Sequence, residues 1–91
     1  MSKTYNVSLI SDSTGETLDR IFVSLKAQFG EIKYDVKQFS FTRTENQISK
    51  IIEKYKKKKN PIILFTIVDI ELSNYLKKKC SDEKIPCYGA L

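Results

Sequence analysis

The residue types best suited to chemistry are concentrated in one short segment, which reads Ser11-Asp12-Ser13-Thr14-Gly15-Glu16-Thr17. The segment follows an apolar run at 7–10 and precedes an amphipathic pattern that begins near Leu18. A strand, a turn with one glycine and a helix, in that order, would bring free backbone N–H groups and the positive end of a helix to one place. The segment contains four hydroxyls and two carboxylates, which is more than a structural turn requires. We therefore predict that it binds a ligand that carries phosphate or a phosphate-like group.

Two charged residues outside this segment could complete the site. Arg43 comes after the second predicted strand, and its guanidinium could bind a phosphate or carboxylate through two hydrogen bonds. Its charge would offset Asp12 and Glu16, which would otherwise repel a bare phosphate. The alternative for Arg43 is an exposed cation in the first turn of a helix. Asp69 follows the third predicted strand, and it could belong to the site or be a plain N-cap of the next helix.

Helix capping could explain some of these polar residues. Ser13 and Glu16 have the spacing of a capping box, and so have Thr42 and Glu45 ahead of the second predicted helix. For Thr42 and Glu45 we predict capping rather than a functional role. Capping does not explain why the other polar residues of the first segment occur together with a glycine, which lets a ligand approach the backbone closely.

The composition excludes several classes of active site. The chain has no histidine, so a Ser-His or Cys-His nucleophile cannot be assembled. Cys80 and Cys87 cannot form a zinc site of thiolates and imidazoles, and we expect both to be reduced thiols. The glycine-rich phosphate loop that ends in Gly-Lys-Ser or Gly-Lys-Thr is also absent. We therefore predict no metal site and assign no catalytic residue.

The composition indicates one small domain with a single core. The 91 residues are 41% hydrophobic and 30% charged, and no segment approaches the ~20 apolar residues of a membrane span. The net charge of +5 comes from lysines, which cluster at 56–59 and 77–79 near the ends of predicted helices. Cations there complement the helix dipole, so these clusters do not require a nucleic acid. We expect a cytoplasmic protein with no nucleic-acid or membrane partner.

Strand and helix patterns alternate along the whole chain. Strands are predicted at 5–10, 32–36, 62–68 and 85–88. The second should be an edge strand because polar and apolar residues alternate in it, and the third should be buried on both faces because it is nearly continuously apolar. Helical spacing of apolar residues begins near Leu18, Ile48 and Leu72, and Gly30 is expected at the C-terminus of the first helix.

This order of elements predicts the fold class. It is typical of a single small α/β domain, doubly wound, with a four-stranded parallel sheet in the order 2-1-3-4 and helices on both faces. Ligands bind such sheets beyond the carboxyl ends of the strands, where the direction of winding reverses. For this order the reversal lies between the first and third strands, from which residues 11–17 and Asp69 emerge. The predicted topology and the polar residues therefore indicate the same crevice.

Three segments resemble one protein family, the regulatory proteins of pyruvate, phosphate dikinase and phosphoenolpyruvate synthase. They are Val7 to Leu18, which contains the compositionally unusual first segment, Phe41 to Glu45, and Phe65 to Asp69. Residues 85–87 also fall where the family carries a similar sequence, so the resemblance extends over essentially the whole chain. The positions that it carries over as site residues are Ser11 to Thr17, Arg43, Thr44 and Asp69.

The resemblance implies a bifunctional activity. Members of the family phosphorylate a threonine of the target enzyme with ADP as donor, and reverse this with inorganic phosphate, releasing pyrophosphate. Their P-loop lies in a later, C-terminal domain that is absent here. We therefore expect residues 1–91 to be an N-terminal α/β domain, a fragment without a cofactor of its own and inactive alone. Its partners would be one of the two target enzymes and a nucleotide or phosphate, and it could form a homo-oligomer.

Two other interpretations remain open. Residues 13–17 also resemble the phosphate loop of flavodoxins, which hold FMN at the same topological position, although Asp69 and Ile70 provide no aromatic ring to cover the flavin. A yellow purified protein would identify that alternative. The domain could instead be a non-catalytic interaction module, in which case partner binding would survive alanine substitutions at Ser13 and Thr14.

Overall fold

The computed structural model describes residues 4–29 and 33–90, and strands and helices alternate along them. The strands are β1 (Thr4–Ser11), β2 (Lys33–Phe39), β3 (Pro61–Thr66) and β4 (Cys87–Gly89). The helices are α1 (Glu16–Phe29), α2 (Glu45–Tyr55) and α3 (Ile70–Asp82). The alternation confirms the predicted α/β class, whereas the predicted helix-ending Gly30 lies outside the described residues.

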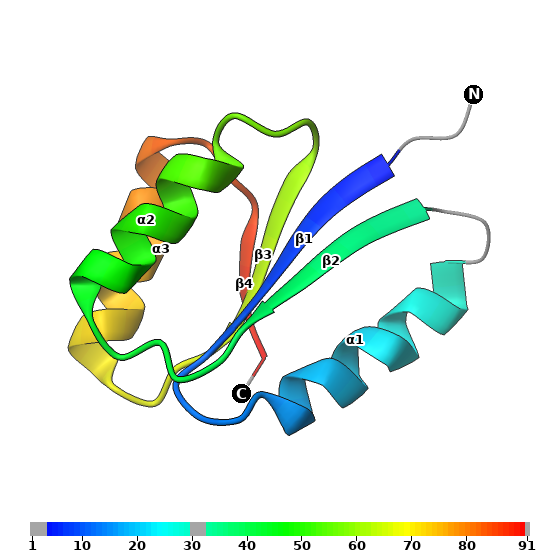
Figure 1. Ribbon diagram of the computed structural model, residues 1–91, viewed down its shortest axis with the longest axis horizontal. Helices are drawn as coiled ribbons and strands as arrows, with labels where there is room; N and C mark the ends of the chain where they lie inside the picture. Colours follow the sequence, from blue (N-terminus) through cyan, green and yellow to red (C-terminus); the bar gives the residue numbers. More distant parts are fainter. Residues whose placement is uncertain (1–3, 30–32, 91) are drawn as a thin grey trace.

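The strands form one parallel sheet in the order β2-β1-β3-β4, as predicted. The register places Ile10 of β1 opposite Phe39 of β2 on one side and Phe65 of β3 on the other. The carboxyl ends of β1, β2 and β3 therefore meet at one edge of the sheet. The loops that follow these strands are neighbours there (Figure 1).

The two faces of the sheet are covered differently (Figure 1). Helix α1 lies alone on one face, whereas α2 and α3 pack side by side on the other. Right-handed crossovers explain this arrangement, because the chain moves from β1 to β2 in one direction and from β2 through β3 to β4 in the opposite direction. The reversal places the connecting helices on opposite faces.

The burial of the strands agrees with the sequence patterns. In β2 the exposed side chains of Lys33, Asp35 and Lys37 alternate with half-buried ones, as expected for an edge strand. In β3 the residues at 63–66 are all buried, because the strand lies between β1 and β4. This strand ends at Thr66, two residues earlier than predicted, and the chain then turns towards α3.

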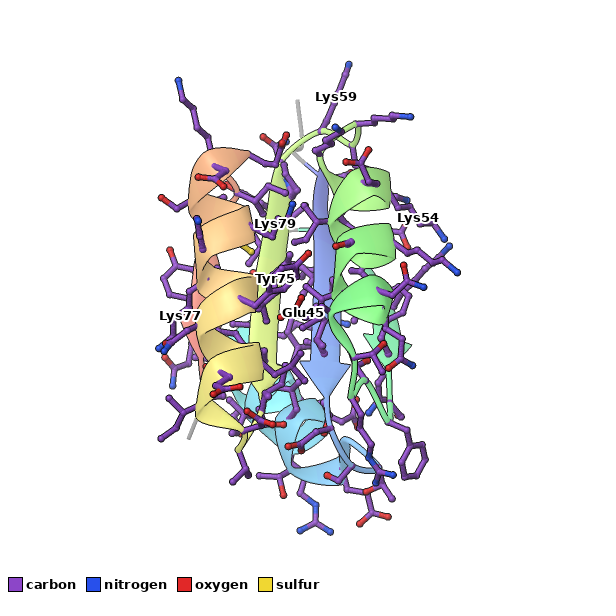
Figure 2. The ribbon with its side chains drawn as sticks, turned by 90° about the vertical axis from the view of Figure 1, so that its left-hand side faces the viewer. Glu45, Lys54, Lys59, Tyr75, Lys77 and Lys79 are labelled. Atoms are coloured by element: carbon purple, nitrogen blue, oxygen red, sulfur yellow. The ribbon has the colours of Figure 1, made fainter. Side chains whose placement is uncertain are left out.

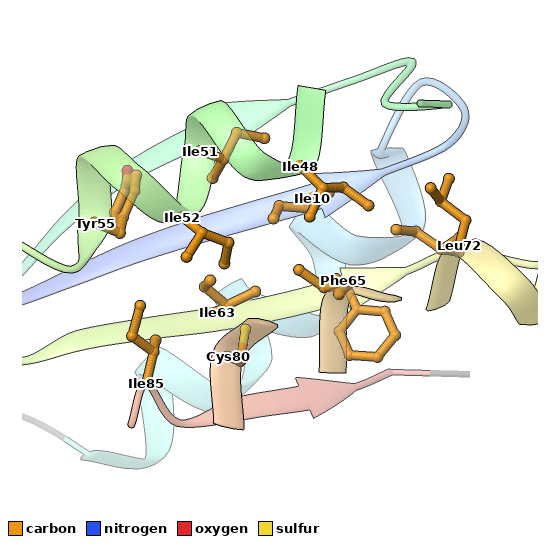
Figure 3. Packing of buried hydrophobic residues seen from close by; sticks show 12 residues of the cluster. Ile10, Ile48, Ile51, Ile52, Tyr55, Ile63, Phe65, Leu72, Cys80 and Ile85 are labelled. Carbon is orange, nitrogen blue, oxygen red and sulfur yellow. The ribbon is translucent and has the colours of Figure 1, made fainter. Parts of the chain in front are cut away.

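Most of the core lies between the sheet and the pair α2 and α3 (Figure 3). Its buried side chains come from two strands, two helices and the loops next to them, and they are Ile10, Ile48, Ile51, Ile52, Tyr55, Ile63, Phe65, Ile67, Leu72, Leu76, Cys80 and Ile85. Figure 2 shows Tyr75 of α3 lying between the two helices, and its hydroxyl is hydrogen bonded to that of Ser49 on α2, 2.6 Å away. A smaller cluster on the other face comprises Val7, Leu9, Leu18, Phe22 and Leu64.

Candidate functional site

The segment from Ser11 to Thr17 includes the turn between β1 and α1, and two other loops approach it at the carboxyl edge of the sheet (Figure 1). The β2–α2 loop contacts it through a hydrogen bond from the Phe41 N–H to the Ser13 carbonyl, at 2.9 Å. The β3–α3 loop contacts it through a hydrogen bond from the Val68 N–H to the Asp12 carboxylate, also at 2.9 Å. The fold thus brings the three predicted polar segments together.

Every backbone carbonyl from Ser11 to Gly15 accepts a hydrogen bond from the protein. In chain order the donors are the N–H of Thr42 (2.8 Å), Nε of Arg43 (3.1 Å), the N–H of Phe41 (2.9 Å), the hydroxyl of Ser40 (2.9 Å) and the N–H of Asp19 (2.9 Å). The side-chain amide of Gln38 also donates to the Thr14 carbonyl, at 3.3 Å. Because most of these donors belong to β2 and the loop after it, the turn is anchored to that loop through its carbonyls.

The backbone N–H groups of the same turn are used differently. The N–H of Asp12 donates to the Thr66 carbonyl at 3.3 Å, and the N–H of Ser13 donates to the Ser11 hydroxyl at 3.1 Å. Within the described residues, the N–H groups of residues 14–17 have no acceptor. The first turn of a helix leaves its N–H groups without intrahelical partners. The turn therefore offers donors and no free carbonyl, an arrangement that suits an anion.

Gly15 is the position at which this turn enters α1. Its φ of +84° lies in the left-handed region, which residues with a side chain rarely adopt. A Cβ atom at this position would also collide with the side-chain amide of Gln38, which covers the glycine from β2. The glycine thus lets the turn lie against the end of β2. The sequence prediction attributed it to ligand approach, whereas the observed close contact is with the protein itself.

Arg43 lies beside the turn, although not within a helix. It precedes Thr44, which is the N-cap of α2. The guanidinium carbon is 5.3 Å from the centroid of the Phe41 ring, and Nε donates to the Asp12 carbonyl. Within the described chain no hydrogen bond is found for the two terminal nitrogens. The positive charge of this exposed residue is therefore held next to the turn, and its two terminal nitrogens can still donate hydrogen bonds to a ligand.

The predicted capping box of Thr42 and Glu45 is wrong, because α2 begins with a different pair. The Gln47 N–H donates to the Thr44 hydroxyl at 3.1 Å, and the Thr44 N–H donates to the Gln47 side-chain oxygen at 3.0 Å. Thr42 is instead buried between the strands, where its N–H and hydroxyl donate to carbonyls of β1 and β2. These contacts consume the groups that Thr42 would need for capping.

The predicted box of Ser13 and Glu16 is also not formed. The hydroxyl of Ser13 lies 3.2 Å from the hydroxyl of Ser11. The first hydrogen bond of α1 is accepted by the carbonyl of Gly15, which therefore occupies the N-cap position. The N-terminus of α1 is thus left without a capping side chain among the described residues, so its first N–H groups are not used by a cap.

Several predicted site residues have partners within the protein. Ser11 is fully buried, and its hydroxyl also accepts a hydrogen bond from the Thr66 hydroxyl at 3.2 Å. Asp69 accepts from the Leu72 N–H at 3.2 Å, which confirms the simpler prediction that it is the N-cap of α3. One carboxylate oxygen of Asp12 accepts a hydrogen bond from the Val68 N–H, which holds this side chain against the β3–α3 loop. The residues left exposed around the unpaired N–H groups are Ser13, Thr14, Glu16, Thr17 and Arg43.

Sequence reasoning missed Gln38, Ser40 and Phe41, which hold the turn in place. The signal that could have found them is topological. The parallel pairing of the first two strands places the end of the second next to the end of the first. The polar residues Gln38 and Ser40 were therefore positioned to contact the turn after β1.

A second pair of reactive groups lies at the other side of the domain, between α3 and β4. The thiol of Cys80 is buried and donates a hydrogen bond to the sulfur of Cys87. This hydrogen bond raises the pKa of Cys80, and burial raises it further. The same bond lowers the pKa of Cys87, with help from the nearby charge of Lys77. Both cysteines are free thiols, as predicted.

The described part of the chain also bears on metals and membranes. None of its helices is long and apolar enough to cross a membrane. Between residues 4 and 29 and between 33 and 90, no three side chains of histidine, cysteine, aspartate or glutamate are grouped as metal ligands would be.

Comparisons with known proteins agree with the resemblance seen in the sequence. Residues 7–91 match the model of a family described as kinase/pyrophosphorylase. A relative from Pelagibacter ubique is 60% identical over 91 residues, which cover 100% of this chain and 33% of the relative. Relatives from Ehrlichia chaffeensis and from the Wolbachia of Brugia malayi are each 38% identical, over 99% and 92% of this chain. All three carry the provisional name pyruvate, phosphate dikinase regulatory protein, and the chain spans about a third of their length.

Proposed function

The chain belongs to the kinase/pyrophosphorylase family, and on that premise we propose that it is the N-terminal α/β domain of a regulatory protein of pyruvate, phosphate dikinase or phosphoenolpyruvate synthase. The proposed activity of the whole protein is twofold. It transfers the terminal phosphoryl group of ADP to a threonine hydroxyl of the target enzyme, leaving AMP. In the other direction, inorganic phosphate takes the phosphoryl group from the phosphothreonine, which restores the hydroxyl and releases pyrophosphate.

We propose that the turn between β1 and α1 contributes the phosphate-binding part of this site. The single observation that carries the proposal is the different use of the two kinds of backbone group in the turn: the five carbonyls of residues 11–15 accept hydrogen bonds from the protein, whereas the N–H groups of residues 14–17 have no acceptor among the described residues. A phosphate oxygen needs donors and is repelled by carbonyls. A turn whose carbonyls are already occupied is therefore preorganised for an anion.

The side chains around the turn support an anionic ligand. Arg43 holds a positive charge beside the Asp12 carbonyl and keeps its terminal nitrogens available. The exposed hydroxyls of Ser13, Thr14 and Thr17 can donate further hydrogen bonds to phosphate oxygens. The carboxylate of Asp12 accepts from the Val68 N–H, which reduces the repulsion that its charge would exert on phosphate.

The ligand could be the phosphate of a nucleotide, free phosphate, or the phosphothreonine of the target. All three present the same phosphate chemistry to the turn. Inorganic phosphate, pyrophosphate and ADP therefore serve as probes of one site, and the target enzyme is tested separately.

The binding proposal predicts a specific pattern in an NMR titration of the 91-residue chain. Phosphate, pyrophosphate or ADP should shift the amide signals of 11–17 more than those of 56–59, where the lysine run could attract anions without a built site. Larger shifts at the lysine run would contradict the proposal. Because Arg43 and Arg20 are the only arginines, they form a matched pair for testing the role of charge.

Replacing Arg43 should weaken pyrophosphate binding more than replacing Arg20. Charge-assisted hydrogen bonds contribute about 1.5–3 kcal/mol each, so Arg43→Gln should raise the dissociation constant about tenfold or more. Arg20→Gln removes the same charge from the exposed surface of α1 and should have little effect. Equal weakening by both variants would show that only net charge matters.

The catalytic part of the proposal needs the rest of a family member. A chimera in which this chain replaces the matched third of the Pelagibacter ubique relative should transfer phosphate from ADP to a threonine of the dikinase. Arg43→Gln should reduce that transfer, and Arg20→Gln should not. A folded chimera that binds pyrophosphate but modifies neither target enzyme would contradict the proposed activity while leaving the phosphate site intact.

A further inference from the structure

An apolar groove lies on the face of the sheet that α1 covers alone. It encloses a cavity of about 530 Å³, whose walls come from α1 and from the strands. The walls include Val7, Phe22, Leu25, Tyr34, Leu64 and Tyr88. Lys26 is the charged residue at its rim. The groove is on the face opposite to α2 and α3 and is separate from the predicted phosphate site.

The groove leaves apolar side chains open to water. Tyr88 of β4 is 58% exposed, Leu25 of α1 is 38% exposed, and Tyr34 and Ile62 are only partly buried. Aromatic and aliphatic side chains gathered around one cavity are an unusual surface for an isolated domain, since contiguous exposed apolar patches mark contact sites. One helix is too narrow to cover four strands, whereas the opposite face has two.

The topology indicates what kind of element could cover this groove. A parallel strand added next to β4 would be reached by a crossover helix on the face of α2 and α3, because the direction of winding would not change. A helix reaches the α1 face only when the chain turns back across the sheet. The missing cover must therefore come from polypeptide beyond the next crossover, or from another molecule.

The end of the described chain lies against the same cluster. Ala90 packs against the apolar residues under α1, and its N–H donates to the Phe65 carbonyl at 2.9 Å. The last described residue of the chain therefore lies on the α1 face of the sheet, two residues after Tyr88 of the groove wall. About two thirds of the length of the matched relatives lies outside the match, which is ample chain for a returning helix.

We propose that this groove is an internal docking surface, filled in longer family members by the apolar face of a helix from the polypeptide outside the matched third. A second copy of this chain is a poorer occupant, because each copy carries a net charge of +5 and an isologous contact through the groove would bring two Lys26 residues into one interface. The groove thus fixes the position of this domain relative to the rest of the protein. This inference does not depend on ligand binding at the β1–α1 turn.

Thiol accessibility tests this proposal. One cysteine at a time is introduced as Leu25→Cys on α1 or Tyr88→Cys on β4, in a Cys87→Ser background that retains the buried Cys80 and serves as the unreacted reference. Val23→Cys, on α1 but outside the groove and 58% exposed, is the matched control. Each variant is made in the 91-residue chain and in the chimera with the Pelagibacter ubique relative, and reacted with a maleimide at several protein concentrations.

The two groove positions should react about tenfold or more slowly in the chimera than in the 91-residue chain, because a covered thiol reacts only during local opening. The control should react equally in both. Equal reaction of all three positions in the two proteins would overturn the proposal. Protection in the 91-residue chain that increases with its concentration would also overturn it, in favour of a second copy. Circular dichroism of each variant would show whether it is folded, and the native tyrosine at 88 can be followed by iodination if a variant does not fold.

Discussion

The two faces of the sheet bury apolar surface in different ways. On the face of α2 and α3, side chains from two helices and the strands form a continuous cluster in which Ile48, Ile63 and Leu76 are completely buried. On the face of α1, one helix covers a smaller cluster and leaves Leu25 partly exposed beside a cavity. The comparison indicates that the first face supplies most of the stability of the domain, whereas the second keeps surface available for further polypeptide.

The turn between β1 and α1, for which we propose phosphate binding, lies between these two regions. It leads into α1 but is anchored by the loop that leads into α2. The well-packed face therefore positions the turn, because α2 and its N-terminal loop are held by the larger core. We expect the turn to keep its geometry even where the α1 face is uncovered.

The largest predicted difference concerns one substitution made on both faces. Leu76→Ala removes a fully buried side chain of α3 and should lower the free energy of unfolding by about 2–5 kcal/mol. Leu25→Ala truncates the same side chain where it is already 38% exposed, so it should cost less than about 1 kcal/mol in the 91-residue chain. Urea denaturation measures both. Similar losses would contradict the comparison, and a larger loss at Leu25 in the chimera would sharpen it.

A smaller difference is predicted for two buried serines of β1. The Ser11 hydroxyl accepts from the Ser13 N–H and the Thr66 hydroxyl, so Ser11→Ala should destabilise the domain by about 1–3 kcal/mol. By the alternation of the strand, Ser8 lies on the face of α2 and α3, and its buried hydroxyl has no partner among the described residues. Ser8→Ala should therefore be neutral or stabilising by up to ~1 kcal/mol. Equal destabilisation would show that the Ser8 hydroxyl has a partner in solution.

The smallest predicted effect is a difference in thiol reactivity between Cys87 of β4 and Cys80 of α3, which lie at the edge of the well-packed face. Because its pKa is lowered below the ordinary thiol value of 9.0, Cys87 should form a thiolate at lower pH than an ordinary cysteine. Cys80 is buried and its pKa is raised, so it should stay protonated. At about pH 8, iodoacetamide should therefore modify Cys87 first, with a rate that rises with pH. Peptide mapping identifies the modified residue, and equal labelling would show that this border opens readily.

The sequence allowed the fold to be predicted in detail. Apolar residues at strand and helix spacing are local signals, and they correctly placed the alternation of elements and the polar edge strand β2. The order of the strands followed from general rules of chirality and burial, since only a strand between two others needs to be apolar on both faces. The prediction that Asp69 caps α3 also succeeded, because the cap is formed within four residues of sequence.

The predicted capping boxes failed for the opposite reason. The spacing of Thr42 and Glu45 is as good as that of Thr44 and Gln47, and only the contacts of Thr42 with β1 and β2 decide between them. The Phe39 carbonyl of β2 is only three residues away, but the Ser11 carbonyl of β1 is distant in sequence, so the local pattern contains only part of the answer. The same applies to Arg43, whose partner at Asp12 lies on another loop.

Sequence by itself determined which elements form, how they are ordered in the sheet, and that polar residues collect at the carboxyl ends of its strands. These properties depend on the spacing of apolar residues and on chain direction, both of which can be read from residues that are close together in the sequence. Tertiary structure alone decided that the carbonyls of the turn after β1 are bonded to the protein while the N–H groups of residues 14–17 have no acceptor in the described parts of the chain, and that the α1 face remains partly open. Both depend on which distant groups meet across the sheet, because hydrogen bonds and burial are settled by proximity in space rather than along the chain.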